Sequence, residues 1–131
     1  MRVRQPDASL NSPGLWYILI LVIFQWDDDN VAHIAEHGVG PDEAEHVVEH
    51  AMSPFPRTAG DGKFIVWGET PDGWHLQVGF VYLPDDRVDI TLLQPGQIMD
   101  FQMGARVLYV FHAMPMTEKQ KRQFRKQKGR R

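Results

Sequence analysis

In the middle of this chain of 131 residues, the spacing of apolar residues changes from helical to strand-like, and that change constrains the fold most strongly. Up to position 51 the apolar residues recur at helical spacing, first at Val31, Ile34 and Ala35 and then at Ala44, Val47, Val48 and Ala51. From Lys63 onward they form short runs rich in β-branched and aromatic residues, separated by turn sequences. A helical part followed by a strand-rich part predicts an α+β fold rather than alternating β and α units.

Residues that are typical of helix ends mark where three helices should begin and where two of them should end. Asp27 is typical of an N-cap, and a first helix should run from it to Gly38. Pro41 suits the first turn of a second helix, which Pro54 closes. Thr117, with Gln120 three residues later, predicts a capping box and a last helix from Glu118 to about Lys126.

The remaining segments predict strands. They are Trp16 to Trp26, Lys63 to Glu69, Trp74 to Leu83, Val88 to Leu93, Gln97 to Met103 and Arg106 to Met114. Thr70-Pro71-Asp72-Gly73 predicts the turn of one hairpin, and Pro95-Gly96 that of a second. We therefore expect an α+β fold: an N-terminal strand and two helices, an antiparallel β-sheet of about four to five strands, and a C-terminal basic helix.

The N-terminus allows two interpretations. Arg2 and Arg4 precede an apolar run from Leu15 to Phe24, an order that faintly resembles a signal peptide. The run is too short to span a bilayer, and no small-residue cleavage site follows it. We interpret it as a buried strand after a disordered leader at residues 1–14, with one domain over residues 15–131; a membrane or export segment is the alternative.

Charge is distributed unevenly along the chain, whose formal net charge is −3. Residues 1–117 carry 6 Lys or Arg against 16 Asp or Glu, whereas residues 118–131 carry 8 against one. Absence of cysteine excludes disulfides, iron–sulfur clusters and thiol nucleophiles, and it suits a reducing compartment. We expect a cytoplasmic protein with an acidic body and a basic C-terminal segment, and no membrane partner.

Several motifs, taken in order, resemble the BrnT-type toxins of bacterial type II toxin–antitoxin pairs. They are Phe24-Gln25-Trp26-Asp27, His33, His37-Gly38-Val39, Pro41-Asp42-Glu43-Ala44, the hairpin sequences Lys63 to Gly68 and Thr70 to Gly73, Ala113, and Met116-Thr117-Glu118-Lys119. The resemblance covers about residues 21–84 and 107–126. It implies a compact α+β, metal-independent endoribonuclease without a cofactor, inhibited by a cognate antitoxin that is basic and binds DNA.

The chain departs from the family pattern in three places. Residues 1–20 have no counterpart, and residues 87–105 resemble an insertion between the last two strands. The family's C-terminal Arg, Glu-Arg pair and Tyr correspond here to Met114, Gln120-Lys121 and Phe124. Each replacement except Lys121 removes an acid–base or phosphate-binding group, so the resemblance implies a weakened or lost catalytic site.

Candidate catalytic residues follow from the needs of metal-free RNA cleavage, which are a base, an acid and cations for the phosphate charge. His112, near the end of the last strand, and His37, at a helix C-terminus, are the candidates for proton transfer. Lys121 and Arg122 are the candidates for phosphate charge. For either histidine, a packing or solvent-facing role is the alternative.

The basic segment is the candidate nucleic-acid-binding surface, because clustered cations attract RNA or DNA by counterion release. Its candidate contacts are Lys119, Lys121, Arg122, Arg125 and Lys126. A solvated terminal helix is the alternative. The pairs His33 with His37 and His46 with His50 are spaced for zinc on one helix face, but no third ligand follows at a motif spacing, so we expect no metal.

Two hypotheses result. In the first, the protein is an RNA-cleaving toxin, of full or weakened activity, that uses His112 or His37 with Lys121 and Arg122. In the second, it is a non-catalytic relative that keeps the fold to bind an antitoxin-like protein or a nucleic acid. The acidic side chains of the first two helices suit a basic antitoxin segment, or simply form a solvated face.

Overall fold

The computed structural model describes residues 22–129 and confirms an α+β fold. Its order is β1 (Val22–Phe24), α2 (Asp28–Ala35), α3 (Pro41–Glu49), β2 (Arg57–Thr58), β3 (Lys63–Glu69), β4 (His75–Leu83), the 3-10 turns η1 (Asp85–Arg87) and η2 (Ile90–Leu92), α4 (Pro95–Gln102), β5 (Arg106–Pro115) and α5 (Glu118–Gly129). None of the helices in this range is long and apolar enough to cross a bilayer. The leader at residues 1–14, and the expected strand as far as Leu21, lie outside the described residues.

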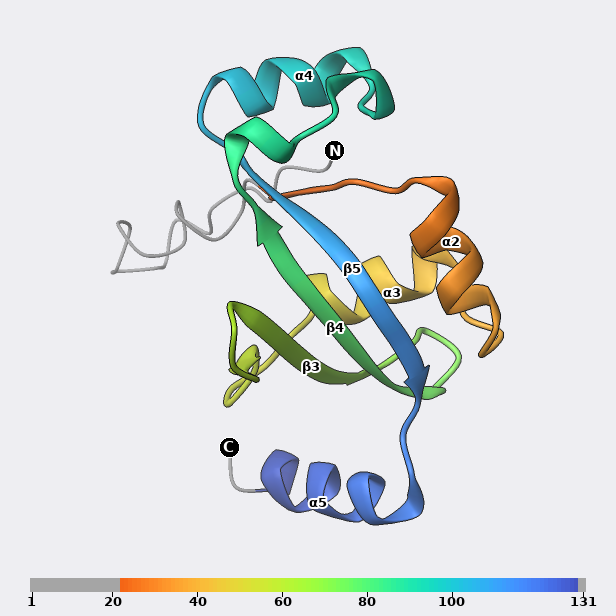
Figure 1. Ribbon diagram of the computed structural model, residues 1–131. Helices are drawn as coiled ribbons and strands as arrows, with labels where there is room; N and C mark the ends of the chain where they lie inside the picture. Colours follow the sequence, from red (N-terminus) through yellow and green to blue (C-terminus); the bar gives the residue numbers. More distant parts are fainter. Residues whose placement is uncertain (1–21, 130–131) are drawn as a thin grey trace.

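The five strands form one sheet in the order β1-β5-β4-β3-β2. Strands β3 to β5 pair antiparallel, as expected, and β2, a short strand that the sequence did not predict, pairs antiparallel with β3. However, β1 pairs parallel with β5, with Val22 opposite Arg106. The sheet is therefore mixed, which corrects the expectation of an antiparallel sheet. After β1 the chain forms α2 and α3 before it enters β3 (Figure 1). Strand β1 is therefore free to pair with the edge of β5 that faces away from β4.

The expected hairpin between Val88 and Met103 is wrong. Its first half forms the turn η2, where the Asp89 side chain accepts a hydrogen bond from the Thr91 backbone N–H. Its second half is helix α4, with Pro95 in the first turn and the Gln97 side chain accepting from the Gln94 backbone N–H. This local cap starts a helix where residue composition alone favours a strand.

The other expected boundaries are confirmed within a few residues. Asp27 accepts from the backbone N–H of Asn30 and caps α2, and Gly38 after that helix has a φ of +77°. Pro41 opens α3, although this helix ends at Glu49, before Pro54. Strands β3 and β4 form the expected hairpin, and β1 ends at Phe24 rather than at Trp26. Helix α5 begins after Thr117 as predicted.

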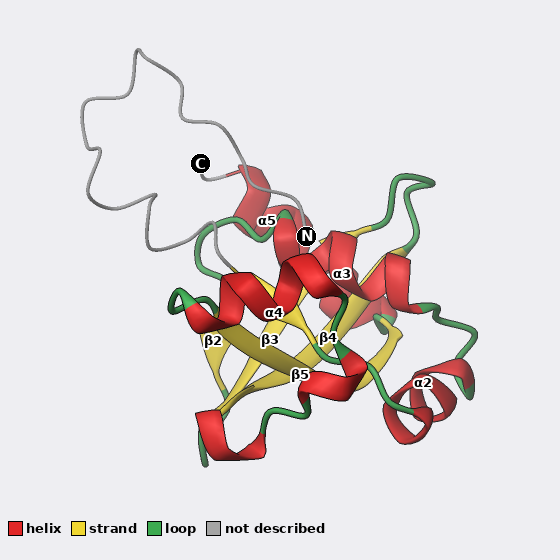
Figure 2. Cartoon of the chain, turned by 90° about the horizontal axis from the view of Figure 1, so that it is seen from above, coloured by secondary structure: helices red, strands yellow, loops and turns green. Residues whose placement is uncertain are grey.

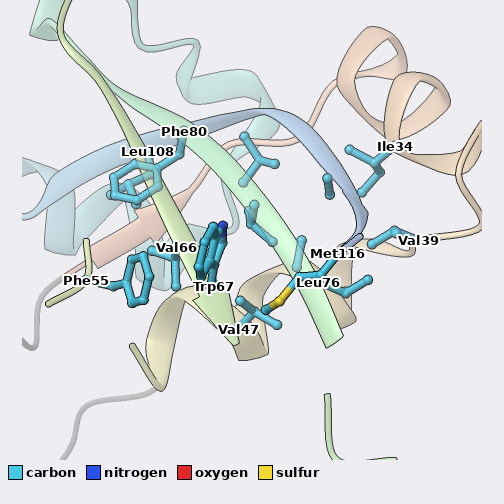
Figure 3. Packing of buried hydrophobic residues seen from close by; sticks show 14 of the residues in the cluster. Ile34, Val39, Val47, Phe55, Val66, Trp67, Leu76, Phe80, Leu108 and Met116 are labelled. Atoms are coloured by element: carbon cyan, nitrogen blue, oxygen red, sulfur yellow. The ribbon is translucent and has the colours of Figure 1, made fainter. Parts of the chain in front are cut away.

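The main core fills the space between one face of the sheet and helices α2 and α3 (Figure 3). Its fully buried side chains alternate along β4, at Leu76, Val78 and Phe80, as one covered sheet face requires. Ile34 of α2 and Val47 of α3 pack on this face. In Figure 1, α3 lies behind β4 and β5, and no helix lies in front of these two strands.

The opposite face of the sheet is covered only toward its ends. At one end, a second cluster joins Ile23 and Val107 to residues of the α4 region, including Leu93, Ile98 and Phe101. Figure 2, seen from above, shows α4 lying across the sheet. At the other end, Phe124 of α5 is buried and contacts the rings of Phe55 and His75. We call the middle of this face the open face. Its side chains are half-buried and include Ile65 of β3, Val81 of β4 and Tyr109 of β5.

The buried side chain of Asn30 connects α2 to the edge of β5. Its Nδ2 donates to the backbone oxygens of Gln25 and Val110, at 3.1 Å each, and its Oδ1 accepts from the Asp27 N–H at 2.8 Å. Next to it, the Tyr109 hydroxyl donates to the Asp27 carboxylate. Burial, together with this carboxylate, raises the pKa of Tyr109 to about 12, so the hydroxyl stays a donor. The Asn30 side chain of α2 thus provides a hydrogen bond to the edge of β5 beyond Leu108, where β1 no longer pairs with it.

Replacement of Asn30 by alanine should destabilise the protein by about 2–4 kcal/mol, because two buried carbonyl oxygens and one N–H lose their partner. Urea unfolding followed by fluorescence measures this loss as a lower midpoint. Gln97 is the matched control, since it holds the same position of a capping box on the exposed start of α4. Gln97→Ala should cost less than about 1 kcal/mol, and equal losses for both variants would contradict the assignment.

Candidate functional site

A β-bulge in β5 determines which side chains reach the open face. Phe80 pairs with Val110, but its neighbour Gly79 pairs with His112, so Phe111 is an extra residue in the strand. In an unbroken register His112 would face Val78, which is fully buried in the core. The extra residue shifts the alternation by one and turns His112 toward the open face.

The ring of Phe111 lies over Gly79. A Cβ atom at Gly79 would come within 2.8 Å of the Phe111 Cζ, closer than such atoms approach. The Lys63 Nζ of β3 lies over the same ring, 5.6 Å from its centroid, within reach of a cation–π contact. The open face therefore carries an aromatic surface and a cation beside His112.

Gln77 of β4 connects His112 to two other side chains. Its Oε1 accepts from the Trp67 indole N–H at 2.9 Å and from Gln120 Nε2 of α5 at 3.2 Å. Its Nε2 is 3.4 Å from His112 Nε2. The candidate site is therefore built from three strands and the first turn of α5. We call it the His112 site and define it by Lys63, Gln77, Phe111, His112 and Gln120.

His37, the second candidate for proton transfer, lies beside this site. The ring centroids of His37 and His112 are 6.4 Å apart, in an edge-on arrangement. Burial, followed by the nearby His37 and His33, lowers the pKa of His112 below its ordinary value of 6.5. His112 is therefore mostly neutral at pH 7, which is the form that accepts a proton.

The candidate cations of α5 lie mainly in solvent. Lys121 is half-buried and its Nζ pairs with Glu118 at 3.0 Å. The other four candidate contacts are exposed: Lys119, Arg122, Arg125 and Lys126. Lys128 turns back to the sheet and pairs with Glu69 of β3 at 2.9 Å. The helix therefore presents a row of exposed cations, while its connection to the His112 site runs through Gln120.

Two positions that differ from the BrnT-type pattern have structural contacts. The Gln120 Oε1 accepts from the Thr117 backbone N–H at 2.9 Å and caps α5. Phe124 is buried in the core. The third, Met114, pairs with Gln77 across β4 and β5 and is half-buried next to the site. These positions surround the region that holds His112, although none of them carries a charge.

Gln77, Lys63 and Phe111 belong to the site but were absent from the sequence-based candidates. Lys63 is the first residue of β3, and Gln77 is a single polar residue between apolar ones in β4, so neither position has a distinguishing mark in the sequence. The pairing register of β3, β4 and β5 alone brings them together. The bulge has one sequence signal, Gly79 in the middle of a strand, because glycine there often marks a close approach.

The histidine pairs on the helices do not form a metal centre with their neighbours. His46 and His50 stack with ring centroids 4.0 Å apart, and His50 Nδ1 lies 2.8 Å from the His46 backbone oxygen. Within residues 22–129, no group of three His, Asp or Glu side chains is arranged to hold a metal ion.

The acidic residues of α3 line a shallow hollow of about 390 Å³. It lies between α3 and the turn that joins β3 and β4, and is lined by Asp42, Glu43, Glu45, His46, Glu49, Thr70, Pro71 and Asp72. Burial raises the pKa of Glu45, partly offset by the hydrogen bond that it accepts from the Trp26 indole N–H at 2.7 Å. The acidic face expected from the sequence is thus concave.

Comparison of the chain with protein-family models, with curated proteins and with solved structures found no match in any of the three. The assignment of a function therefore depends on the geometry of the His112 site and on the charge of α5.

Gly79→Ala should destabilise the protein by about 1–2 kcal/mol, because the new methyl group displaces the Phe111 ring that covers it. Gly96→Ala is the control with the opposite sign. Gly96 lies in the first turn of α4 with nothing within 4 Å, so alanine there should stabilise by about 0.4–1 kcal/mol. Thermal unfolding of both variants measures the difference. A Gly79→Ala protein as stable as the wild type would contradict the packing of Phe111 on β4.

Proposed function

We propose that the protein acts on RNA as a weakened, metal-independent endoribonuclease related to the BrnT-type toxins. The observation that carries this proposal is the pair His112 and His37, whose ring centroids are 6.4 Å apart on a face that also holds Lys63. Two imidazoles at this separation can exchange protons with the ribose 2′-oxygen and the leaving 5′-oxygen when RNA is cleaved.

The chemistry needs one base and one acid. A base removes the proton of a ribose 2′-hydroxyl, whose oxygen then bonds to the adjacent phosphorus. The bond from phosphorus to the 5′-oxygen breaks, and that oxygen takes a proton from an acid. His112 is the base in this scheme, since its lowered pKa keeps the ring neutral at pH 7, and its Nε2 becomes available when the contact with Gln77 opens. His37 is the acid, and Lys63 with the cations of α5 offsets the phosphate charge.

Weak catalysis follows from the groups that the site lacks. An arginine would bind two phosphate oxygens at once, and Met114 offers no charge there. Gln120 exchanges no proton near neutral pH, and its Oε1 is occupied by the Thr117 N–H. Phe124 has no hydroxyl and is buried. A positioned cation for the phosphate is worth a few kcal/mol, so we expect cleavage on the order of a hundredfold below that of a fully equipped site.

A second candidate function is a non-catalytic module that binds RNA or a partner protein. The structural contacts of Gln120 and Phe124 favour it, because both positions stabilise α5 instead of serving chemistry. The hollow beside α3, lined by carboxylates, suits a basic partner such as a cognate antitoxin of a type II toxin–antitoxin pair. In this case the basic helix binds without cleavage.

Replacement of His112 by alanine should lower RNA cleavage by purified protein at least about a hundredfold, the range that a positioned base contributes. His50→Ala is the matched control. It removes an exposed histidine at the end of α3 and should leave cleavage unchanged. Gel analysis of a labelled RNA with free chelator present measures both. Cleavage that is equal in the two variants would contradict a role for His112, and binding without cleavage by the wild type would support the second candidate.

The triple variant Lys121→Ala, Arg122→Ala, Arg125→Ala should weaken RNA binding equally for different sequences and flatten its salt dependence. Each lost phosphate contact lowers the slope of log K against log salt by about 0.7 for single strands. The variant should therefore lose up to about 2 from the slope, measured by fluorescence anisotropy. Arg87→Ala, which removes an exposed cation on η1, should leave the slope unchanged. An unchanged slope in the triple variant would show that α5 does not contact phosphates.

A further inference from the structure

The hydrogen bonds around Gln77 have a fixed direction, which begins at Trp67. An indole N–H can only donate a hydrogen bond, so the atom of Gln77 that it meets at 2.9 Å must be the amide oxygen. The exposed fraction of Trp67 is 8%, and the ring of Phe55 packs against it, so the indole is held in place. This contact determines the orientation of the Gln77 amide.

The contact with α5 gives the same orientation independently. The Thr117 backbone N–H can only donate, so the Gln120 atom at 2.9 Å from it is the oxygen Oε1. The remaining Nε2 of Gln120 is then a donor, and it lies 3.2 Å from the Gln77 oxygen. Two donors with determined directions therefore meet the same oxygen of Gln77.

The other end of the Gln77 amide is consequently its NH₂ group, which faces His112. The distance from Gln77 Nε2 to His112 Nε2 is 3.4 Å. An amide NH₂ can only donate, so His112 Nε2 must accept and carries no proton. A neutral imidazole has one proton, which in this arrangement lies on Nδ1.

We propose that Gln77 is a positioning residue that holds neutral His112 in the tautomer with its proton on Nδ1. The direction is imposed from two sides, by the Trp67 indole and by the capping box of α5. A protonated His112 would place an N–H against the Gln77 NH₂ group, so Gln77 also disfavours the charged ring. The titratable groups that act on His112 are His33 of α2 and His37 in the turn that follows this helix, and they act in the same direction.

This tautomer has a consequence for catalysis, and that part of the inference rests on the proposed function. The lone pair of His112 Nε2 is occupied by Gln77, and Nδ1 carries a proton and cannot accept another. His112 in this form is a poor base until Gln77 moves. A carboxylate at position 77 would reverse the arrangement, because it accepts from Nε2–H, frees the Nδ1 lone pair and increases the basicity of the ring.

The tautomer can be measured on the full-length protein without any ligand. Long-range proton–nitrogen correlation NMR at about pH 8, above the ordinary histidine pKa, distinguishes protonated from unprotonated ring nitrogens. The spectrum of a His112→Gln protein assigns the signals. Two other histidines serve as internal references, since His75 Nε2 donates to Glu69 at 3.1 Å and His50 Nδ1 donates to the His46 oxygen at 2.8 Å.

The wild-type spectrum alone decides the proposal. His112 should show the Nδ1–H pattern of His50 and not the Nε2–H pattern of His75. Gln77→Glu should convert His112 to the Nε2–H pattern and raise its pKa, while Gln123→Glu, which adds the same charge at an exposed position of α5, should change neither. A wild-type His112 with its proton on Nε2, or with both tautomers equally populated, would overturn the assignment.

Activity provides a second readout that separates this inference from the proposed function. If the protein cleaves RNA, Gln77→Glu should raise the rate at neutral pH by about tenfold or more, within the range that a positioned base contributes. Gln123→Glu should not. A lower rate in Gln77→Glu, with the tautomer reversed, would overturn the catalytic consequence. Absence of cleavage in all proteins, with the Nδ1–H tautomer confirmed, would refute the ribonuclease proposal and support the positioning role of Gln77.

Discussion

The single extra residue in β5 is the constraint on which the candidate site depends. Because Phe111 is inserted opposite the bond between Gly79 and Phe80, the strand changes the face that its side chains occupy. Val110 before the bulge and Ala113 after it both belong to the core, although they are three positions apart and would lie on opposite faces of an unbroken strand. The same insertion brings His112 and Phe111 together on the open face. The packing of Val110 and Ala113 in the core therefore holds the bulge in place, and the bulge keeps the polar His112 out of the core.

Helix α5 links stability with chemistry. Gln120 caps the helix with its oxygen and contacts Gln77 with its nitrogen, so the start of the helix and the orientation of the Gln77 amide depend on the same side chain. Phe124, one turn later, seats the helix on Phe55 and His75. The helix is thus attached to the sheet by Gln120 and Phe124, together with the ion pair of Lys128 with Glu69. Its exposed cations, Lys119, Arg122, Arg125 and Lys126, remain available for a ligand.

Local sequence signals predicted three of the helices. Most features that the sequence did not predict depend on pairing between residues far apart in the chain. Asp27, Pro41 and Thr117 act within one turn of chain, so their caps were readable. The helix α4 was missed because its apolar residues suit a strand equally well, and its cap uses Gln94, a weak signal. The parallel pairing of β1, the bulge and the contact of Gln77 with His112 join residues 30 or more positions apart. His37 and His112 were both candidates, but their proximity depends on how α2 lies along β5.

The short first strand has a consequence for how copies of the molecule meet one another. Unpaired strand edges attract other strands, and natural sheets shield them. Among the described residues, β1 pairs with β5 from Val22 to Phe24, and beyond its end the Asn30 amide takes over at the Val110 oxygen, so a helix side chain occupies a position where a neighbouring strand would pair. The opposite edge, β2, is two residues long and follows a proline, which limits templating there. At these positions both edges of the sheet are shielded, which disfavours edge-to-edge pairing between folded chains.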